Sequence, residues 1–192
     1  MFRAFIAALT LAAVAPTVRA ADEENPYKNA KVGDYATYTM ITKVAGVDIA
    51  GTITQTVTAK SEKEATVKVT GEFEFGGNKM KIPEQEQKID LTKPFDPTKG
   101  ANLPGGADAK VEKGKEGKEK IKVGGKEYDT AWTTYKVKAK VMNQDVDADI
   151  KAWTAKNIPS GMVKMTMTAD IAGQKMEMTM ELKETGNKKP EK

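Results

Sequence analysis

The chain has no cysteine and no histidine, and these two absences exclude much of the usual chemistry of exported proteins and enzymes. Without cysteine there can be no disulfide and no thiol nucleophile. Without histidine there can be no histidine-dependent triad and few of the common zinc sites. Paired carboxylates remain open as a catalytic alternative, although the Asp and Glu residues mostly alternate outward. We therefore expect no catalytic residues, no metal and no cofactor, and a fold that its apolar core alone stabilises.

After residue 20 the sequence also lacks any stretch with the apolar spacing of an amphipathic helix. Strict alternation of apolar and polar residues takes its place, in about eight to nine segments separated by turn residues. A sheet with one apolar face and no covering helix must bury that face by curling, by folding over as a sandwich, or by holding a lipid. The fold class we expect is all-β, an antiparallel meander that forms a strongly curved sheet or a barrel.

Residues 1–20 have the three parts of a secretory signal peptide. Arg3 supplies the positive start, residues 4–15 are apolar and rich in alanine, and residues 18–20 (VRA) form a small-residue cleavage site. The apolar run is too short for a permanent membrane span. We therefore expect residues 21–192 to be a single soluble β domain, exported to the periplasm or out of the cell, with no integral membrane span.

The last hairpin, residues 161–184, has the clearest alternation in the chain. A two-residue turn at Ala172-Gly173 would place Met167 opposite Met178 and Asp170 opposite Lys175. One face of this hairpin is then apolar and rich in methionine, and the other is polar.

The mature chain divides into two meander halves, residues 33–91 and 121–184. Residues 92–120, with three prolines and many charges, are expected to be a long loop, and residues 185–192 a polar tail. Within the first half, Pro83 coincides with a change of apolar phase, which predicts a bulge or a strand break.

In the second half a ladder of lysines faces a ladder of aspartates. A turn at residues 142–143 sets Lys136, Lys138 and Lys140 against Asp149, Asp147 and Asp145. The aspartates resemble the start of a calcium loop, but Ile150 and Lys156 stand where that loop needs glycine and glutamate. The same register places Trp132 opposite Trp153 on the charged face, either as a surface contact site or beneath a bulge or loop.

The methionine spacing has two interpretations. Thioether ligands select Cu(I), but alternate residues of a strand are ordinarily core, and methionine also lines lipid cavities well. We favour the second interpretation. The residues expected to face a ligand or the core are Met165, Met167, Met176, Met178, Met180, Tyr135, Phe73 and Phe75.

Three short motifs resemble a known group of proteins. They are residues 32–35 (VGDY), residues 122–128 (KVGGKEY), and a closing segment that runs from Trp153-Thr154 through Pro159 to residues 163–164 (VK). They are similar to small uncharacterised exported β-sheet proteins of planctomycete-type bacteria and, more distantly, to periplasmic lipoprotein carriers of the LolA/LolB kind. The resemblance implies an exported β-sheet protein and supplies no catalytic residues.

The sequence therefore predicts an exported, non-catalytic binding protein that holds a lipid or another apolar small molecule. The alternative is a structural or interaction protein of the cell envelope, with a closed, dry core and an envelope protein as its partner. Nucleic acid is not expected as a partner, because Glu112, Glu116 and Glu119 interrupt the lysine-rich segment 110–126.

Overall fold

The computed structural model describes residues 25–93, 110–141, 144–171 and 173–188. These residues form one antiparallel sheet of nine strands and a single turn of 3-10 helix, η1 (Pro26–Lys28). The strands are β1 (Asp34–Val44), β2 (Val47–Lys60), β3 (Glu64–Phe75), β4 (Asn78–Asp90), β5 (Lys110–Val123), β6 (Lys126–Val141), β7 (Gln144–Thr154), β8 (Met162–Ile171) and β9 (Gln174–Asn187). The expected signal peptide, residues 1–20, and most of the expected long loop lie outside the described residues.

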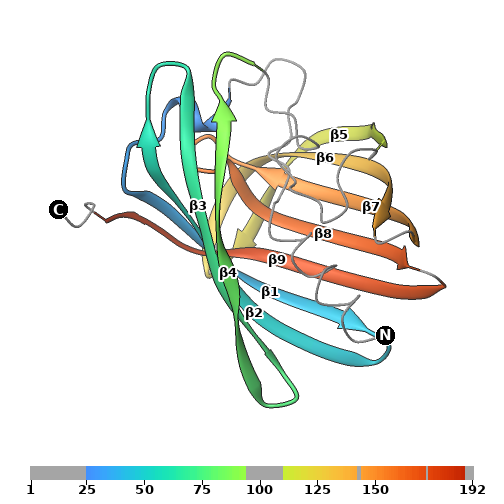
Figure 1. Ribbon diagram of the computed structural model, residues 1–192. Coiled ribbons are helices and arrows are strands. Elements are labelled where there is room, and N and C mark those ends of the chain that lie inside the picture. Colours follow the sequence, from blue (N-terminus) through green and yellow to red (C-terminus); the bar gives the residue numbers. More distant parts are fainter. Residues whose placement is uncertain (1–24, 94–109, 142–143, 172, 189–192) are drawn as a thin grey trace.

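The order of the strands is β4-β3-β2-β1-β9-β8-β7-β6-β5. Two meanders, β1 to β4 and β5 to β9, are therefore joined where β1 pairs with β9. Figure 1 shows β3 and β4 running steeply across the direction of β5 to β9, so the sheet is strongly twisted and curled. This confirms the predicted curved all-β meander. Within the described residues β4 and β5 are the two edges, so the sheet curls without closing.

The predicted irregularity at Pro83 is confirmed as a bulge in β4. Val69 pairs with Gln85 and Gly71 pairs with Ile82, so one residue of β3 faces two of β4. Proline has no backbone N–H to give to the ladder, and an edge strand with a bulge tolerates that loss.

The expected loop 92–120 is wrong for residues 110–120, which belong to β5. This strand is charged on both sides, so alternation could not reveal it. Its residues pair with β6 from Lys110↔Lys138 to Val123↔Lys126, with a bulge between Lys113 and Glu116. Charged side chains and a bulge are common on edge strands, because they discourage pairing with a second sheet.

The predicted registers of the two C-terminal hairpins are confirmed. Met167 pairs with Met178 and Asp170 with Lys175 in β8 and β9. In β6 and β7 the lysine ladder faces the aspartate ladder as predicted, and Trp132 pairs with Trp153. Apart from the two tryptophans, these registers keep the large apolar residues on one side of the sheet.

That apolar side forms one continuous core across both halves. It includes side chains from every strand, among them Tyr38, Ile53, Val67, Ile82, Val123, Val146 and Leu182. At the end of the sheet near η1, Tyr27 and Leu91 extend this core.

Candidate functional site

The paired strands align methionines in rows across the buried side of the sheet. In one row, Met165 of β8 pairs with Met180 of β9, which also pairs with Met40 of β1. In the next row, Met167 pairs with Met178, and Met178 also pairs with Thr42 of β1. We call the surface formed by Met40, Met165, Met167, Met176, Met178 and Met180 the methionine face. All six of its side chains are buried.

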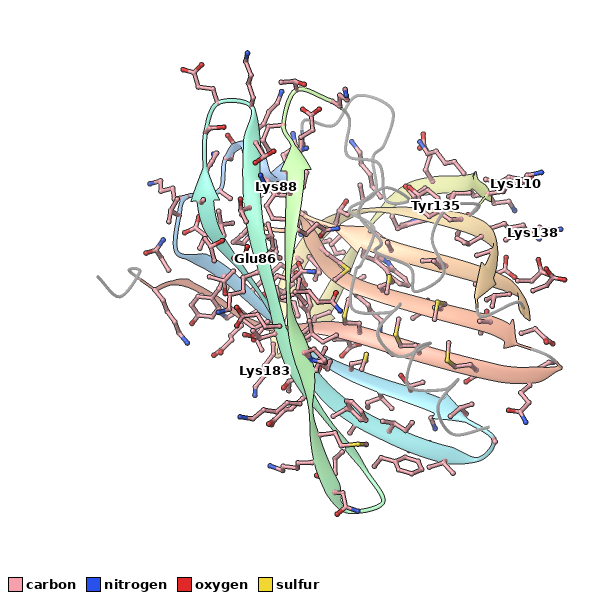
Figure 2. The ribbon with its side chains drawn as sticks, viewed as in Figure 1. Glu86, Lys88, Lys110, Tyr135, Lys138 and Lys183 are labelled. Atoms are coloured by element: carbon pink, nitrogen blue, oxygen red, sulfur yellow. The ribbon has the colours of Figure 1, made fainter. Side chains whose placement is uncertain are left out.

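The remaining two described methionines, Met80 and Met162, also belong to the core or pack against it. Figure 2 shows most of the sulfur atoms gathered over β8 and β9. Methionine is unbranched and polarisable, so it can adapt its shape to a neighbouring apolar group.

The other predicted site residues continue these rows. Phe73 of β3 is buried. It pairs with Gly51 of β2, which pairs on its other side with Met40 of β1. A side chain at Gly51 would collide with β3, since a Cβ there would lie 2.7 Å from the backbone oxygen of Glu72 and 3.2 Å from the Cβ of Phe73. Phe75 is partly buried against the same core.

Tyr135 lies at the other end of the second row, where it pairs with Ile150, which in turn pairs with Met167. Burial raises the pKa of Tyr135 to about 12, so its phenol is neutral at ordinary pH. The structure therefore brings all eight predicted residues onto one uncharged surface.

Thr42 is a polar exception within that surface. Its side chain is in phase with Met40 and Val44 and is 1% exposed. Among the residues that the structure describes, its Oγ1 has no hydrogen-bond partner. Sequence reasoning missed this residue, although its phase relative to Met40 would have placed it on the apolar side.

The polar groups near η1 are satisfied by hydrogen bonds. The Tyr38 hydroxyl donates to the carbonyl of Met162 at 3.2 Å and is also hydrogen-bonded to the Ser160 hydroxyl. The Met162 N–H donates back to Ser160 Oγ at 3.4 Å. This ring of bonds fixes the turn between β7 and β8 against β1.

The two tryptophans lie on the polar side of the sheet, as their positions in the alternating strands predicted. Trp153 is nevertheless only 8% exposed. Its indole N–H donates to Glu119 Oε1 at 2.5 Å. Lys151 Nζ binds the same carboxylate oxygen at 3.0 Å and lies 4.4 Å from the ring centres of both Trp132 and Trp153. We call Glu119, Trp132, Lys151 and Trp153 the tryptophan cluster.

Three members of the tryptophan cluster bond to one another, because the Glu119 carboxylate accepts from both Trp153 and Lys151. Trp132 also packs over Gly117 of β5, where a Cβ would lie 2.7 Å from the indole ring. The predicted contact surface is thus reduced to the half-buried Trp132. Glu119 could not be predicted as a partner, because β5 was not recognised as a strand.

The rest of the polar side carries ion pairs. A hollow of about 570 Å³ over β6 to β9 is lined by the two ladders, with Lys136–Asp149 and Lys138–Asp147 each at 3.9 Å. Among the residues described, no group of three acidic side chains is arranged to hold a metal. In the same part of the chain no helix is both long enough and apolar enough to span a membrane.

Comparison with known proteins identifies no family, since no family model matches the chain. The search of curated proteins likewise finds no significant match.

Solved structures of similar shape do exist. One is an exported protein described as having a YmcC-like fold, from Bacteroides fragilis NCTC 9343, with 9% identity, a TM-score of 0.47, and coverage of 82% of this chain and 97% of the other. A second is described as a lipoprotein, from Parabacteroides distasonis ATCC 8503, with 11% identity, a TM-score of 0.46, and coverage of 86% and 100%.

A third is described as an outer-membrane lipoprotein-sorting protein domain, from Vibrio parahaemolyticus, with 11% identity, a TM-score of 0.29, and coverage of 88% and 91%. Likenesses this distant assign neither a family nor a function to the chain.

Proposed function

We propose that this protein is an exported, non-catalytic binding protein that holds a lipid or another apolar molecule on its methionine face. One observation carries the proposal: the paired strands place methionines in adjacent, uncharged rows on a single side of one curled sheet. Such a surface matches a long hydrocarbon chain, which needs apolar contact and no charge.

The choice of residue favours a ligand surface over an ordinary core. The buried core of the described residues contains seven methionines, seven valines, five isoleucines and two leucines, and six of the methionines lie together on the methionine face. A dry core is normally built from leucine, isoleucine and valine, whose few rotamers specify one packing. Methionine specifies packing poorly and adapts to guests of different shape.

The non-catalytic part of the proposal rests on the missing chemistry. The chain has no histidine and no cysteine. The buried hydroxyls of Tyr38 and Ser160 bond to each other. The charged residues of β6 and β7 face one another on the polar side.

A second candidate is a structural or interaction protein of the cell envelope with a dry core. The observation that favours it is the burial of the methionine face, whose six side chains are at most 7% exposed. In that case an envelope protein would be the partner, and Trp132 would mark the surface to search.

Native mass spectrometry of residues 21–192, purified without detergent, separates the two candidates. The proposal predicts one apolar molecule per chain, which lipid extraction and mass analysis would then identify. A protein that is empty and still fully stable would support the dry core.

A further inference from the structure

Thr42 lies in the middle of the methionine face and has an unused hydroxyl. It pairs with Met178 of β9 on one side and with Ile49 of β2 on the other. Along its own strand the neighbours on the same side are Met40 and Val44. All four neighbours are apolar, so none can accept or donate a side-chain hydrogen bond with useful strength.

Leaving such a group buried and unbonded costs free energy, and valine would fit the same volume without that cost. Most buried polar groups in proteins have a partner, and an exception calls for a specific explanation. A bound molecule that carries a hydrogen-bond acceptor would remove the cost.

We propose that the Thr42 hydroxyl donates a hydrogen bond to the carbonyl oxygen of a neutral acyl ester whose hydrocarbon chain lies on the methionine face. This inference rests on the proposed function and names the class of ligand. Thr42 is then a specificity-determining residue, which distinguishes an acyl ester from a plain hydrocarbon.

The surroundings of Thr42 select a neutral ester over a free fatty acid. The row that contains Thr42 runs from Tyr135 to Ile49 through Ile150, Met167 and Met178, and it carries no charge. A carboxylate buried there would lack a counter-ion, and burying an unpaired charge is far more costly than burying an ester. One donor on an apolar surface matches one carbonyl oxygen.

The test is a ligand displacement assay on residues 21–192 after bound lipid has been stripped. The neutral fluorescent reporter N-phenyl-1-naphthylamine occupies the site, and methyl dodecanoate or tetradecane displaces it. The two competitors have equal chain lengths and differ only in the ester group. The variants are Thr42→Val, which removes the hydroxyl at constant shape, and Thr42→Ser, which keeps it.

We expect Thr42→Val to weaken the binding of methyl dodecanoate about fivefold, which corresponds to the net free energy of one hydrogen bond. Tetradecane should bind the variant as well as it binds the wild type, and Thr42→Ser should keep most of the preference for the ester. Equal effects of Thr42→Val on both competitors would overturn the assignment of Thr42 and leave the proposed function standing. If neither competitor nor the reporter binds the wild type, the proposed function itself fails.

Thermal stability of the stripped protein gives an independent readout. Removal of an unpaired buried hydroxyl should raise the melting temperature of Thr42→Val above that of the wild type by roughly 2–6 °C. A lower melting temperature would show that the hydroxyl already has a partner in the empty protein, such as a buried water, and would contradict the inference.

Discussion

At the scale of single residues, the two sides of β8 have opposite surroundings. Met167 is 7% exposed and packs in the methionine face, whereas its neighbour Thr168 is exposed on the polar side. Thr168 lies between Asp149 of β7 and Glu177 of β9. The same substitution at these two adjacent positions therefore meets opposite surroundings.

We predict that Met167→Lys lowers the free energy of unfolding by about 3 kcal/mol or more, because it buries a charge without a partner. Thr168→Lys should change it by no more than about 0.5 kcal/mol, since it places a lysine between two carboxylates. Chemical denaturation of both variants measures the difference. Equal stabilities would contradict the register of β8.

The hydrogen-bonded ring around Tyr38 gives a second prediction at this scale. Tyr38→Phe leaves the Ser160 hydroxyl and the Met162 carbonyl short of a partner in the core, which should cost about 1–3 kcal/mol of stability. Tyr35→Phe is the control, because Tyr35 is only half-buried. Similar losses in both variants, measured by denaturant unfolding, would argue against the ring.

At the scale of elements, the edge strand β5 is joined to the sheet by its backbone ladder and by the tryptophan cluster. Hydrogen bonds from Trp153 and then Lys151 lower the pKa of the Glu119 carboxylate below its usual value of 4.5. A carboxyl group whose pKa is lower in the folded than in the unfolded protein stabilises the fold fully at pH values above its pKa in the unfolded protein. That contribution disappears as the pH falls through the folded pKa.

We therefore predict that wild type and Glu119→Gln differ most in melting temperature above about pH 4.5, and that the difference shrinks in more acidic solution. Tryptophan fluorescence follows unfolding and also reports on Trp153 directly. Glu112→Gln is the control, because it removes a carboxylate from the same strand without contact to Trp153. A difference that stays constant down to acidic pH would show that the carboxylate is not held by the cluster.

The elements also show how far sequence reasoning reaches in this chain. Strands with one apolar side, such as β8 and β9, were predicted to the exact pairing, because a slip by one residue would bury charges. β5 was missed because it lies at an edge and its charged residues, such as Lys113, Glu116 and Lys118, follow no period. The tryptophan cluster depends on β5, so the sequence left open whether Trp153 is a surface contact or lies beneath a covering segment, and could not name Glu119 as its partner.

At the scale of the whole molecule, two meanders are held together where β1 pairs with β9, and the methionine face crosses that seam. Met40 and Thr42 come from the first meander, and Met178 and Met180 from the second. A chain that lies across this face contacts both halves at once. Binding should therefore stabilise the whole fold.

We predict that methyl dodecanoate at about 100 times its dissociation constant stabilises the stripped wild type by roughly 2.7 kcal/mol. For a domain of this size that corresponds to a rise in melting temperature of about 5–10 °C. Calorimetry with increasing ester measures the rise. A melting temperature independent of ester concentration would mean that the native protein does not bind it.

Methionine-methyl NMR tests the central claim most directly, since each methionine of the stripped protein gives its own signal. Titration with methyl dodecanoate should shift the signals of Met40, Met165, Met167, Met178 and Met180 together, and the shifts should saturate at one ester per chain. If the ester binds and these signals do not move, the ligand lies elsewhere and the methionine face is only a core. If the ester does not bind and the methionine signals remain sharp and unchanged, the protein has the closed interior of an envelope structural protein.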